Sequence, residues 1–200
     1  MKKQRILVFG GTFNPPHLGH LNLLQAFRQE MDFDKVLILP SAYPPHKEEI
    51  EHISGEIRAK MCALAFEGCE ICDYEIKRGG KNYTADTLEY LKSVYPDSVL
   101  YFLMGTDMLL SFNKWRDPER ILKNAVLLCA CRDGETKAKE LEEFALNELG
   151  LTKEQFIISN KSPFKVSSTA IRQAVKNKED ISAFVPQKVA KFIEREGLYG

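Results

Sequence analysis

Residues 5–28 contain a short apolar strand, a turn rich in glycine and proline, and an amphipathic helix. This strand–turn–helix unit is the sequence feature that most restricts the possible folds. Gly10 and Gly11 are expected to turn the backbone sharply off the strand, and without a Cβ they permit close approach of a ligand. A helix start leaves backbone N–H groups unpaired and carries partial positive charge, which suits it to phosphate. The unit therefore predicts an anion site at the end of a strand.

Two histidines stand at the start of this helix. His17 and His20 are three residues apart, so on a helix they share one face. Two imidazoles beside a helix N-terminus can bind a polyphosphate and stabilise charge that develops on it. The turn lacks the Gly-Lys-Ser/Thr of a P-loop and the G-x-G-x-x-G of dinucleotide-binding proteins, so the predicted phosphate site is of another kind.

A second motif follows about 150 residues later, in residues 165–172. Ser167 and Ser168, with the neighbouring threonine, supply hydroxyls and backbone donors at the start of a helix. Arg172 lies one turn after Ser168 on the same face, so its guanidinium can reach an anion held there. Taken alone, the motif favours an N-capped helix with a solvated arginine, and it becomes specific only in combination with the first motif.

Strand-like and helical segments alternate along the chain, which favours an α/β fold with a Rossmann-like, doubly wound parallel sheet. No repeat, low-complexity stretch or linker interrupts residues 1–200, so we expect a single domain with C-terminal helices. The expected strands are 5–9, 35–39, 70–76, 99–104, 125–131 and 156–159. The expected helices are 18–31, 55–66, 85–94, a short one near 107–112, 137–149, 168–176 and 187–196.

The bulk composition limits the classes of partner. Lys plus Arg and Asp plus Glu number 28 each, so no net charge attracts nucleic acid or a membrane surface. No apolar stretch approaches 18 residues, and the N-terminus enters a strand without a signal-peptide pattern. We expect a cytoplasmic protein with no nucleic-acid or membrane partner, and the composition leaves a homo-oligomer open.

Five cysteines, an odd number, argue against a complete disulfide framework. Cys69 and Cys72 have C-x-x-C spacing, but on a strand they point to opposite faces, which spoils a zinc chelate. Cys129 and Cys131 end an apolar run and are interpreted as buried small hydrophobic residues. We expect no metal site built from these thiols.

Four unusual residues follow predicted strands, where a doubly wound sheet binds its ligands. Lys47 ends a proline-rich loop and can meet a phosphate or remain a solvated surface lysine. Thr84 can cap the next helix, whose first N–H groups can bind a carboxylate. Asp107 can hold ribose hydroxyls or cap a short helix. Trp115, the only tryptophan, can stack on a flat ring or anchor its loop.

The two motifs together resemble a known superfamily. The stretch GGTFNPPHLGH is similar to the HxGH signature of the nucleotidyltransferases, and VSSTAIR resembles the ISSTxxR motif of its adenylyltransferases, with Val166 in place of the first isoleucine. The PPHK, RGGKNYTADTL, GTDMLLSFNKW and EREGLY segments extend the resemblance over essentially the full length, to the bacterial nicotinate (nicotinamide) mononucleotide adenylyltransferases. Asn14 stands where many relatives have Asp, and both residues can hold a turn.

The resemblance implies roles for individual residues. His17, His20 and Arg172 are expected to be catalytic. The residues expected to bind ATP are Gly10, Gly11, Thr12, Phe13, His17, His20, Gly105, Asp107, Ser167, Ser168 and Arg172. The residues expected to surround nicotinate mononucleotide are Lys47, Thr84, Trp115 and Arg132. Trp115 would stack on the ring and Thr84 would lie near the carboxylate.

The implied reaction is transfer of AMP from ATP to nicotinate mononucleotide, in NAD biosynthesis, with pyrophosphate as the leaving group. Mg²⁺ is expected to arrive with ATP, since no acidic cluster in the sequence indicates a metal cage held by the protein. Other acceptors, namely phosphopantetheine, flavin mononucleotide or nicotinamide mononucleotide, stay open at this point. A catalytically silent nucleotide-sensing module is the alternative from another class.

Overall fold

The computed structural model describes residues 3–42, 53–131, 135–159, 161 and 164–200. Lys47 and Arg132 therefore lie outside the described residues. The chain forms two compact units: the first contains residues 1–10, 23–37 and 83–163, and the second contains residues 11–22, 38–82 and 164–200. The single domain expected over residues 1–200 stays a prediction, and each unit is described by itself.

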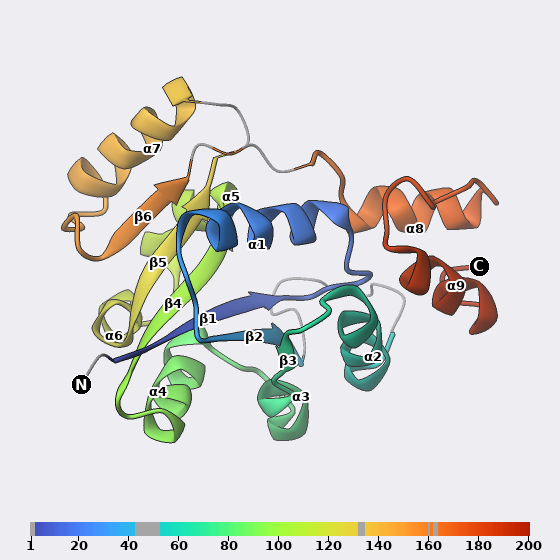
Figure 1. Cartoon of the computed structure of the whole chain (residues 1–200), viewed down its shortest axis with the longest axis horizontal. Helices are drawn as coiled ribbons and strands as arrows, with labels where there is room; N and C mark the ends of the chain where they lie inside the picture. Colours follow the sequence, from blue (N-terminus) through green and yellow to red (C-terminus); the bar gives the residue numbers. More distant parts are fainter. Residues whose placement is uncertain (1–2, 43–52, 132–134, 160, 162–163) are drawn as a thin grey trace. The chain divides into compact units, whose positions relative to one another are not determined.

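Six strands form one sheet in the order β3-β2-β1-β4-β5-β6 (Figure 1). This is the strand order of doubly wound nucleotide-binding sheets, in which strands are added first on one side of β1 and then, from β4, on its other side. The pairs β1–β4, β4–β5 and β5–β6 are parallel, which confirms the predicted Rossmann-like fold. The strands are β1 Gln4–Gly11, β2 Lys35–Pro40, β3 Glu70–Ile71, β4 Ser98–Gly105, β5 Ala125–Ala130 and β6 Phe156–Ser159.

Most helices fall where the sequence predicts them, within one or two residues at each end. The helices are α1 Leu18–Glu30, α2 Gly55–Ala65, α3 Tyr74–Arg78, α4 Thr84–Val94, α5 Thr106–Leu110, η1 Phe112–Lys114, α6 Pro118–Asn124, α7 Glu135–Asn147, α8 Ser168–Lys176 and α9 Gln187–Arg195. Sequence reasoning missed α6, although Pro118 at its first position is a helix-start signal.

The strand predicted over 70–76 is wrong beyond Ile71. Cys72 N–H still donates to the carbonyl of Ile38 in β2 at 2.8 Å, but β2 ends at Pro40. A proline has no N–H to offer a ladder, so the pairing partner stops there. The chain then turns into α3, and Cys69 and Cys72 do not lie along one strand as expected.

The core of the first unit is built on central strands that are buried on both faces. Ile6, Leu7 and Val8 are consecutive in β1 and fully buried, as expected of a parallel strand with both faces covered. Beyond β5, Cys131 packs with Ala138 and Leu141 of α7. Cys131 is thus a small core residue, as its sequence context predicts.

The second unit has its own apolar packing, in which α2 lies against α9. Met61 and Cys62 of α2 are fully buried, and burial raises the pKa of the Cys62 thiol, which therefore stays protonated. Val189 and Phe192 of α9 are also buried. Across the described residues, no helix is long and apolar enough to cross a membrane.

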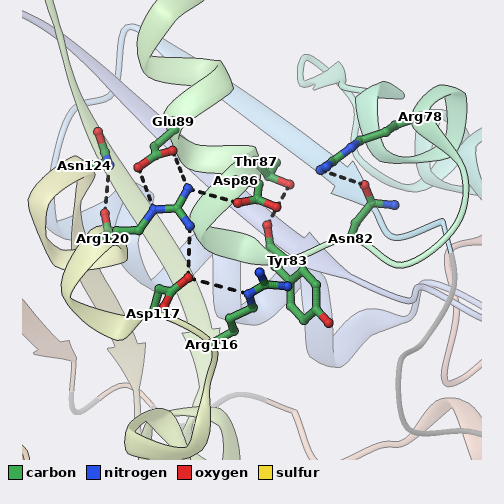
Figure 2. A network of polar contacts seen from close by, with 10 residues as sticks. All are labelled: Arg78, Asn82, Tyr83, Asp86, Thr87, Glu89, Arg116, Asp117, Arg120 and Asn124. Carbon is green, nitrogen blue, oxygen red and sulfur yellow. Dashed lines mark hydrogen bonds and ion pairs between the residues drawn. The ribbon is translucent and has the colours of Figure 1, made fainter.

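A charged network ties α4 to α6 in the first unit (Figure 2). The Arg120 guanidinium donates to Glu89 Oε1 at 2.9 Å, to Asp86 Oδ1 at 3.0 Å and to Asp117 Oδ2 at 3.0 Å. Nearby, the Arg116 guanidinium lies 4.3 Å from the centre of the Tyr83 ring. The start of α4 and the start of α6 are therefore held together by one arginine.

Replacing Arg120 by Met should make the α4–α6 packing less stable in a pH-dependent way. Hydrogen bonding from Arg120 lowers the pKa of the Glu89 carboxyl in the folded protein. The stabilisation from this ion pair is therefore fully present above the pKa of Glu89 in the unfolded chain, about 4.3, and it is lost as the pH falls through the lower pKa of the folded protein. The melting temperature of Arg120→Met should therefore fall below that of wild type at pH 7, and the difference should shrink as the pH falls below about 4, through the lowered pKa of Glu89.

Thermal melts between pH 3 and pH 7, followed by circular dichroism, measure this difference. Lys191→Met removes one exposed cation from α9 and is the matched control, with no expected change. A difference between Arg120→Met and wild type that does not depend on pH would contradict the assigned ion pairs.

Candidate active site

The turn after β1 is not made by the glycines. Gly10 and Gly11 are the last two residues of the strand, and neither has a positive φ; the left-handed residue is Phe13, with φ of 50°. The expectation of a turn at the glycines is therefore corrected. Gly11 serves close packing instead, because a Cβ there would lie 2.9 Å from the Phe13 ring. That ring is buried and also meets the edge of His20, with 5.0 Å between ring centres.

His17 and His20 cap the start of α1 reciprocally. The His17 carbonyl accepts the first helical hydrogen bonds, and its Nδ1 accepts from the backbone N–H of His20 at 3.3 Å. His20 Nδ1 in turn accepts from the backbone N–H of His17 at 3.2 Å. This is the bonding pattern of a capping box, here made by two imidazoles. The spacing of three residues therefore satisfies orphan backbone donors as well as placing both rings on one face.

The reciprocal bonds also fix the chemistry of the two rings. They stack with their centres 3.6 Å apart and their planes 21° from parallel, and His17 is only 6% exposed. A nitrogen that accepts a hydrogen bond carries no proton, so each neutral imidazole has its proton on Nε2. Nε2–H is a donor suited to a phosphate oxygen. Two parallel donors at one helix start can stabilise charge that develops on a polyphosphate.

The second sequence motif meets this loop. Ser168 Oγ donates to the carbonyl of Pro15 at 2.9 Å, and Arg172 Nη1 donates to the carbonyl of Asn14 at 2.8 Å. Ser167 is the N-cap of α8 and accepts from Ala170 N–H. The two motifs, about 150 residues apart in the chain, are thus joined directly in the second unit. We call the loop 11–17 together with His20, Ser168 and Arg172 the phosphate cluster.

Three residues that support the phosphate cluster were missed by sequence reasoning. Tyr199 Oη donates to Asn14 Oδ1 at 2.6 Å in a buried contact, and Arg58 Nη1 donates to the carbonyl of Thr12 at 2.7 Å. Gly19 is the third: a Cβ there would lie 2.8 Å from the backbone oxygen of Phe164. Only Gly19 had a local signal, its place between the two histidines.

In the first unit, β1 and β4 end at one edge of the sheet, with Phe9 opposite Leu103 in register. Gly105 is the last residue of β4 and the N-cap of α5, with no side-chain capping bond. Asp107 lies inside the first turn and is exposed, so of its two possible roles the capping of α5 is excluded. Its proposed role toward ribose stays a prediction.

The start of α4 lacks a capping side chain. Its N-cap is Tyr83, and Thr84 is the first helical residue, so the expectation that Thr84 caps the helix is wrong. Thr84 is half-buried beside the backbone donors of the first turn. An uncapped helix start with partial positive charge is suited to a carboxylate.

Trp115 follows η1 and is half-buried. Its ring approaches the edge of Phe102, with 6.2 Å between centres, and is tilted against Phe112 at 5.7 Å. The structure thus supports the anchoring role of Trp115. Stacking on a flat ligand ring stays a prediction, for which the same two contacts provide a fixed orientation.

Within the described ranges, no group of three or more His, Cys, Asp or Glu residues could hold a metal ion. The polar side chains of the phosphate cluster are imidazoles, hydroxyls, an amide and a guanidinium, which can donate hydrogen bonds to anions. Mg²⁺ prefers carboxylate, water and phosphate oxygens. The cluster therefore fits a phosphate chain and does not fit a resident magnesium ion.

Comparisons with known proteins agree with this geometry. Residues 8–174 match the family model described as cytidylyltransferase-like. The "Probable nicotinate-nucleotide adenylyltransferase" of Clostridium tetani is 35% identical over 208 residues, covering all of both chains. Its counterpart of the same name in Clostridium acetobutylicum is 36% identical over 202 residues, again covering all of both chains.

The fold is also similar to solved structures. Plasmodium falciparum nicotinic acid mononucleotide adenylyltransferase complexed with NaAD superposes with a TM-score of 0.77 and 16% identity, covering 98% of this chain and 97% of that one. The same enzyme complexed with APC gives a TM-score of 0.74 at 14% identity. At this identity the likeness shows a shared fold.

Two substitutions at His17 should separate capping from catalysis. His17→Ala removes both the cap and the Nε2 donor, so we expect a loss of about 1 kcal/mol in unfolding free energy and of about 10²–10³ in turnover, with partial ATP binding. His17→Asn keeps a capping oxygen and should lose only turnover. Urea unfolding and steady-state kinetics measure the two effects, and near-normal turnover in either variant would remove His17 from the mechanism.

Gly19→Ala should destabilise the protein although Gly19 is in a helix. In an open helical position this change is favourable by about 1 kcal/mol, but here the new Cβ meets a backbone oxygen and must displace it, which typically costs about 1–3 kcal/mol. We expect a lower melting temperature and weaker ATP binding. Gly200→Ala, where a Cβ meets nothing within 4 Å, is the control. A stabilised Gly19→Ala variant would refute the close approach.

Proposed function

Because the chain belongs to the cytidylyltransferase-like family, in its nicotinate-nucleotide adenylyltransferase branch, we propose that it transfers AMP from ATP to nicotinate mononucleotide, giving nicotinate adenine dinucleotide and pyrophosphate in NAD biosynthesis. The observation that carries the proposal is the phosphate cluster, in which the capped histidine pair and the Ser168–Arg172 motif meet at one loop. The proposal places the enzyme in the cytoplasm, where ATP is available.

The reaction needs no strong general base. The phosphate of the mononucleotide is already an anion, so one of its oxygens can attack the α-phosphorus of ATP directly. A new P–O bond forms there, and the bond from the α-phosphorus to the bridging oxygen breaks, so that the electron pair leaves with pyrophosphate. The difficulty is to bring two anions together and to stabilise the leaving group, so catalysis depends mainly on positioning and electrostatic stabilisation.

The phosphate cluster supplies both positioning and positive charge in the proposal. His17 and His20 would donate from Nε2 to phosphate oxygens, and the start of α1 would add its backbone donors. Arg172, half-buried and held by the Asn14 carbonyl, would add positive charge. We propose the same ATP-binding residues as the sequence predicts: Gly10, Gly11, Thr12, Phe13, His17, His20, Gly105, Asp107, Ser167, Ser168 and Arg172.

The ATP substrate would enter with Mg²⁺ bound to its phosphates, since this is how magnesium is commonly held at such sites. The ion would neutralise phosphate charge, while the side chains of the chain itself bind and orient the nucleotide. This assignment agrees with the donor character of the phosphate cluster.

For the acceptor we propose Lys47, Thr84, Trp115 and Arg132. The uncapped start of α4 at Thr84 favours the nicotinate carboxylate over a neutral carboxamide, because a helix N-terminus attracts negative charge. Trp115, fixed by Phe102 and Phe112, would stack on the pyridine ring. The acid form of the mononucleotide is therefore the proposed substrate.

Pyrophosphate release should be measured with Mg-ATP and each of nicotinate mononucleotide, nicotinamide mononucleotide, flavin mononucleotide and phosphopantetheine in parallel. We expect a clear preference for nicotinate mononucleotide. Pyrophosphate release with this acceptor should be lost in His17→Asn, which keeps the helix cap. Activity with another acceptor would preserve the ATP site and overturn the acceptor assignment. Silence with all four would favour a nucleotide-binding role without catalysis.

A further inference from the structure

Arg58 is a buried cation that no part of the proposed reaction uses. It lies on α2 in the second unit and is only 3% exposed. Its guanidinium donates to four backbone carbonyls: Thr12 at 2.7 Å, Ser41 at 2.6 Å, Ala42 at 3.1 Å and Ile53 at 3.3 Å. One side chain therefore joins the phosphate cluster to the end of β2 and to the residue before the N-cap of α2.

The contact with the phosphate cluster is reinforced by the backbone. Ser41 N–H donates to the Gly11 carbonyl at 2.9 Å, while the Ser41 carbonyl accepts from Arg58. Gly11 is thus held by Ser41, and Thr12 is held by the guanidinium directly. Arg58 therefore contacts this part of the loop directly at Thr12 and indirectly through Ser41.

The partners of Arg58 are carbonyl dipoles. Within the part of the chain that the structure describes, no carboxylate lies within salt-bridge distance of its guanidinium. Burial lowers the pKa of Arg58, but an arginine starts so high that it stays charged at neutral pH. A buried charge is strongly unfavourable unless hydrogen bonds satisfy it, and here four carbonyls do so. The fold therefore keeps a full positive charge directly behind the loop of the phosphate cluster.

A charge in this position acts on the loop as well as holding it. The Thr12 carbonyl belongs to the same peptide group as the N–H of Phe13, and a charged donor on the oxygen polarises that group. In a low-dielectric interior the positive potential also extends further than it would in water. Both effects favour an anion in front of residues 11–13.

We propose that Arg58 is a positioning residue for the phosphates of ATP, acting through the positive charge that it places next to Gly11 and Thr12 inside the fold. The proposal rests on the function proposed above, because it takes the ligand of residues 11–13 to be a nucleoside triphosphate. Arg58 is not expected to touch the ligand, since its donors are occupied by the four carbonyls.

Two variants separate charge from hydrogen bonding. Arg58→Lys keeps the charge and loses most of the four contacts, and Arg58→Gln loses the charge but keeps a donor. ATP and adenosine binding should be measured by calorimetry without any acceptor, and kcat and KM for ATP should be measured at saturating acceptor. Adenosine is the uncharged reference, and Lys60→Met, an exposed cation on the same helix, is the control variant.

We expect Arg58→Gln to weaken ATP binding about tenfold, as for the loss of one charge-assisted interaction, and to raise KM for ATP by a similar factor with little change in kcat. Adenosine binding should be unchanged, and Arg58→Lys should stay within about threefold of wild type for ATP. Lys60→Met should match wild type throughout.

Equal losses of ATP and adenosine binding in Arg58→Gln, or an equal loss of ATP binding in Arg58→Lys and Arg58→Gln, would overturn the role of the charge. If Arg58→Gln does not melt cooperatively, Arg58→Lys decides alone: weakened ATP binding by about tenfold in a folded Arg58→Lys protein refutes the proposal. ATP binding is measured without acceptor, so its outcome does not depend on turnover. A wild-type protein that is inactive with every acceptor would refute the proposed reaction, and the binding data would still decide the role of Arg58.

Discussion

The reciprocal hydrogen bonds between His17 and His20 are the constraint on which the candidate active site depends. A helix start carries backbone donors that need acceptors, and here the two imidazoles provide them through Nδ1. The same bonds assign the ring protons to Nε2 and stack the rings. Structural capping and the supply of phosphate donors are therefore combined in the same two side chains, Nδ1 serving the cap and Nε2 carrying the donor. Gly19 between them has no room for a side chain, because the backbone of Phe164 is too close.

The loop that precedes this helix is held by hydrogen bonds to its backbone carbonyls. Its carbonyls at Thr12, Asn14 and Pro15 receive donors from side chains far away in the chain. Two of these donors are arginines, so satisfying the loop backbone also concentrates positive charge around it. Tyr199, next to the end of the chain, holds the side chain of Asn14. The loop is thus preorganised for an anion by contacts that are made before any ligand binds, which reduces the reorganisation that binding requires.

Two of the residues proposed for the acceptor, Thr84 and Trp115, are positioned by a helix start and by aromatic packing. Thr84 stands at a helix start without a capping side chain, and Trp115 is held by its ring contacts with Phe102 and Phe112. The Arg120 network connects these two helix starts through three carboxylates (Figure 2). Exposed ion pairs contribute little stability individually, so the network is better understood as setting the position of α4 relative to α6.

The sequence by itself determined the α/β class, the parallel sheet, most element boundaries and the two motifs, because hydrophobic periodicity and the residue types at helix starts are local signals. The two motifs that it singled out meet at one loop in the structure, through His17, Ser168 and Arg172. Only the tertiary structure decided that the strand at Glu70 stops after two residues, that Phe13 rather than a glycine makes the turn, and that Thr84 and Asp107 do not cap their helices. It alone revealed Arg58 and Tyr199, since a residue whose partners are backbone carbonyls of distant segments leaves no pattern in its own neighbourhood.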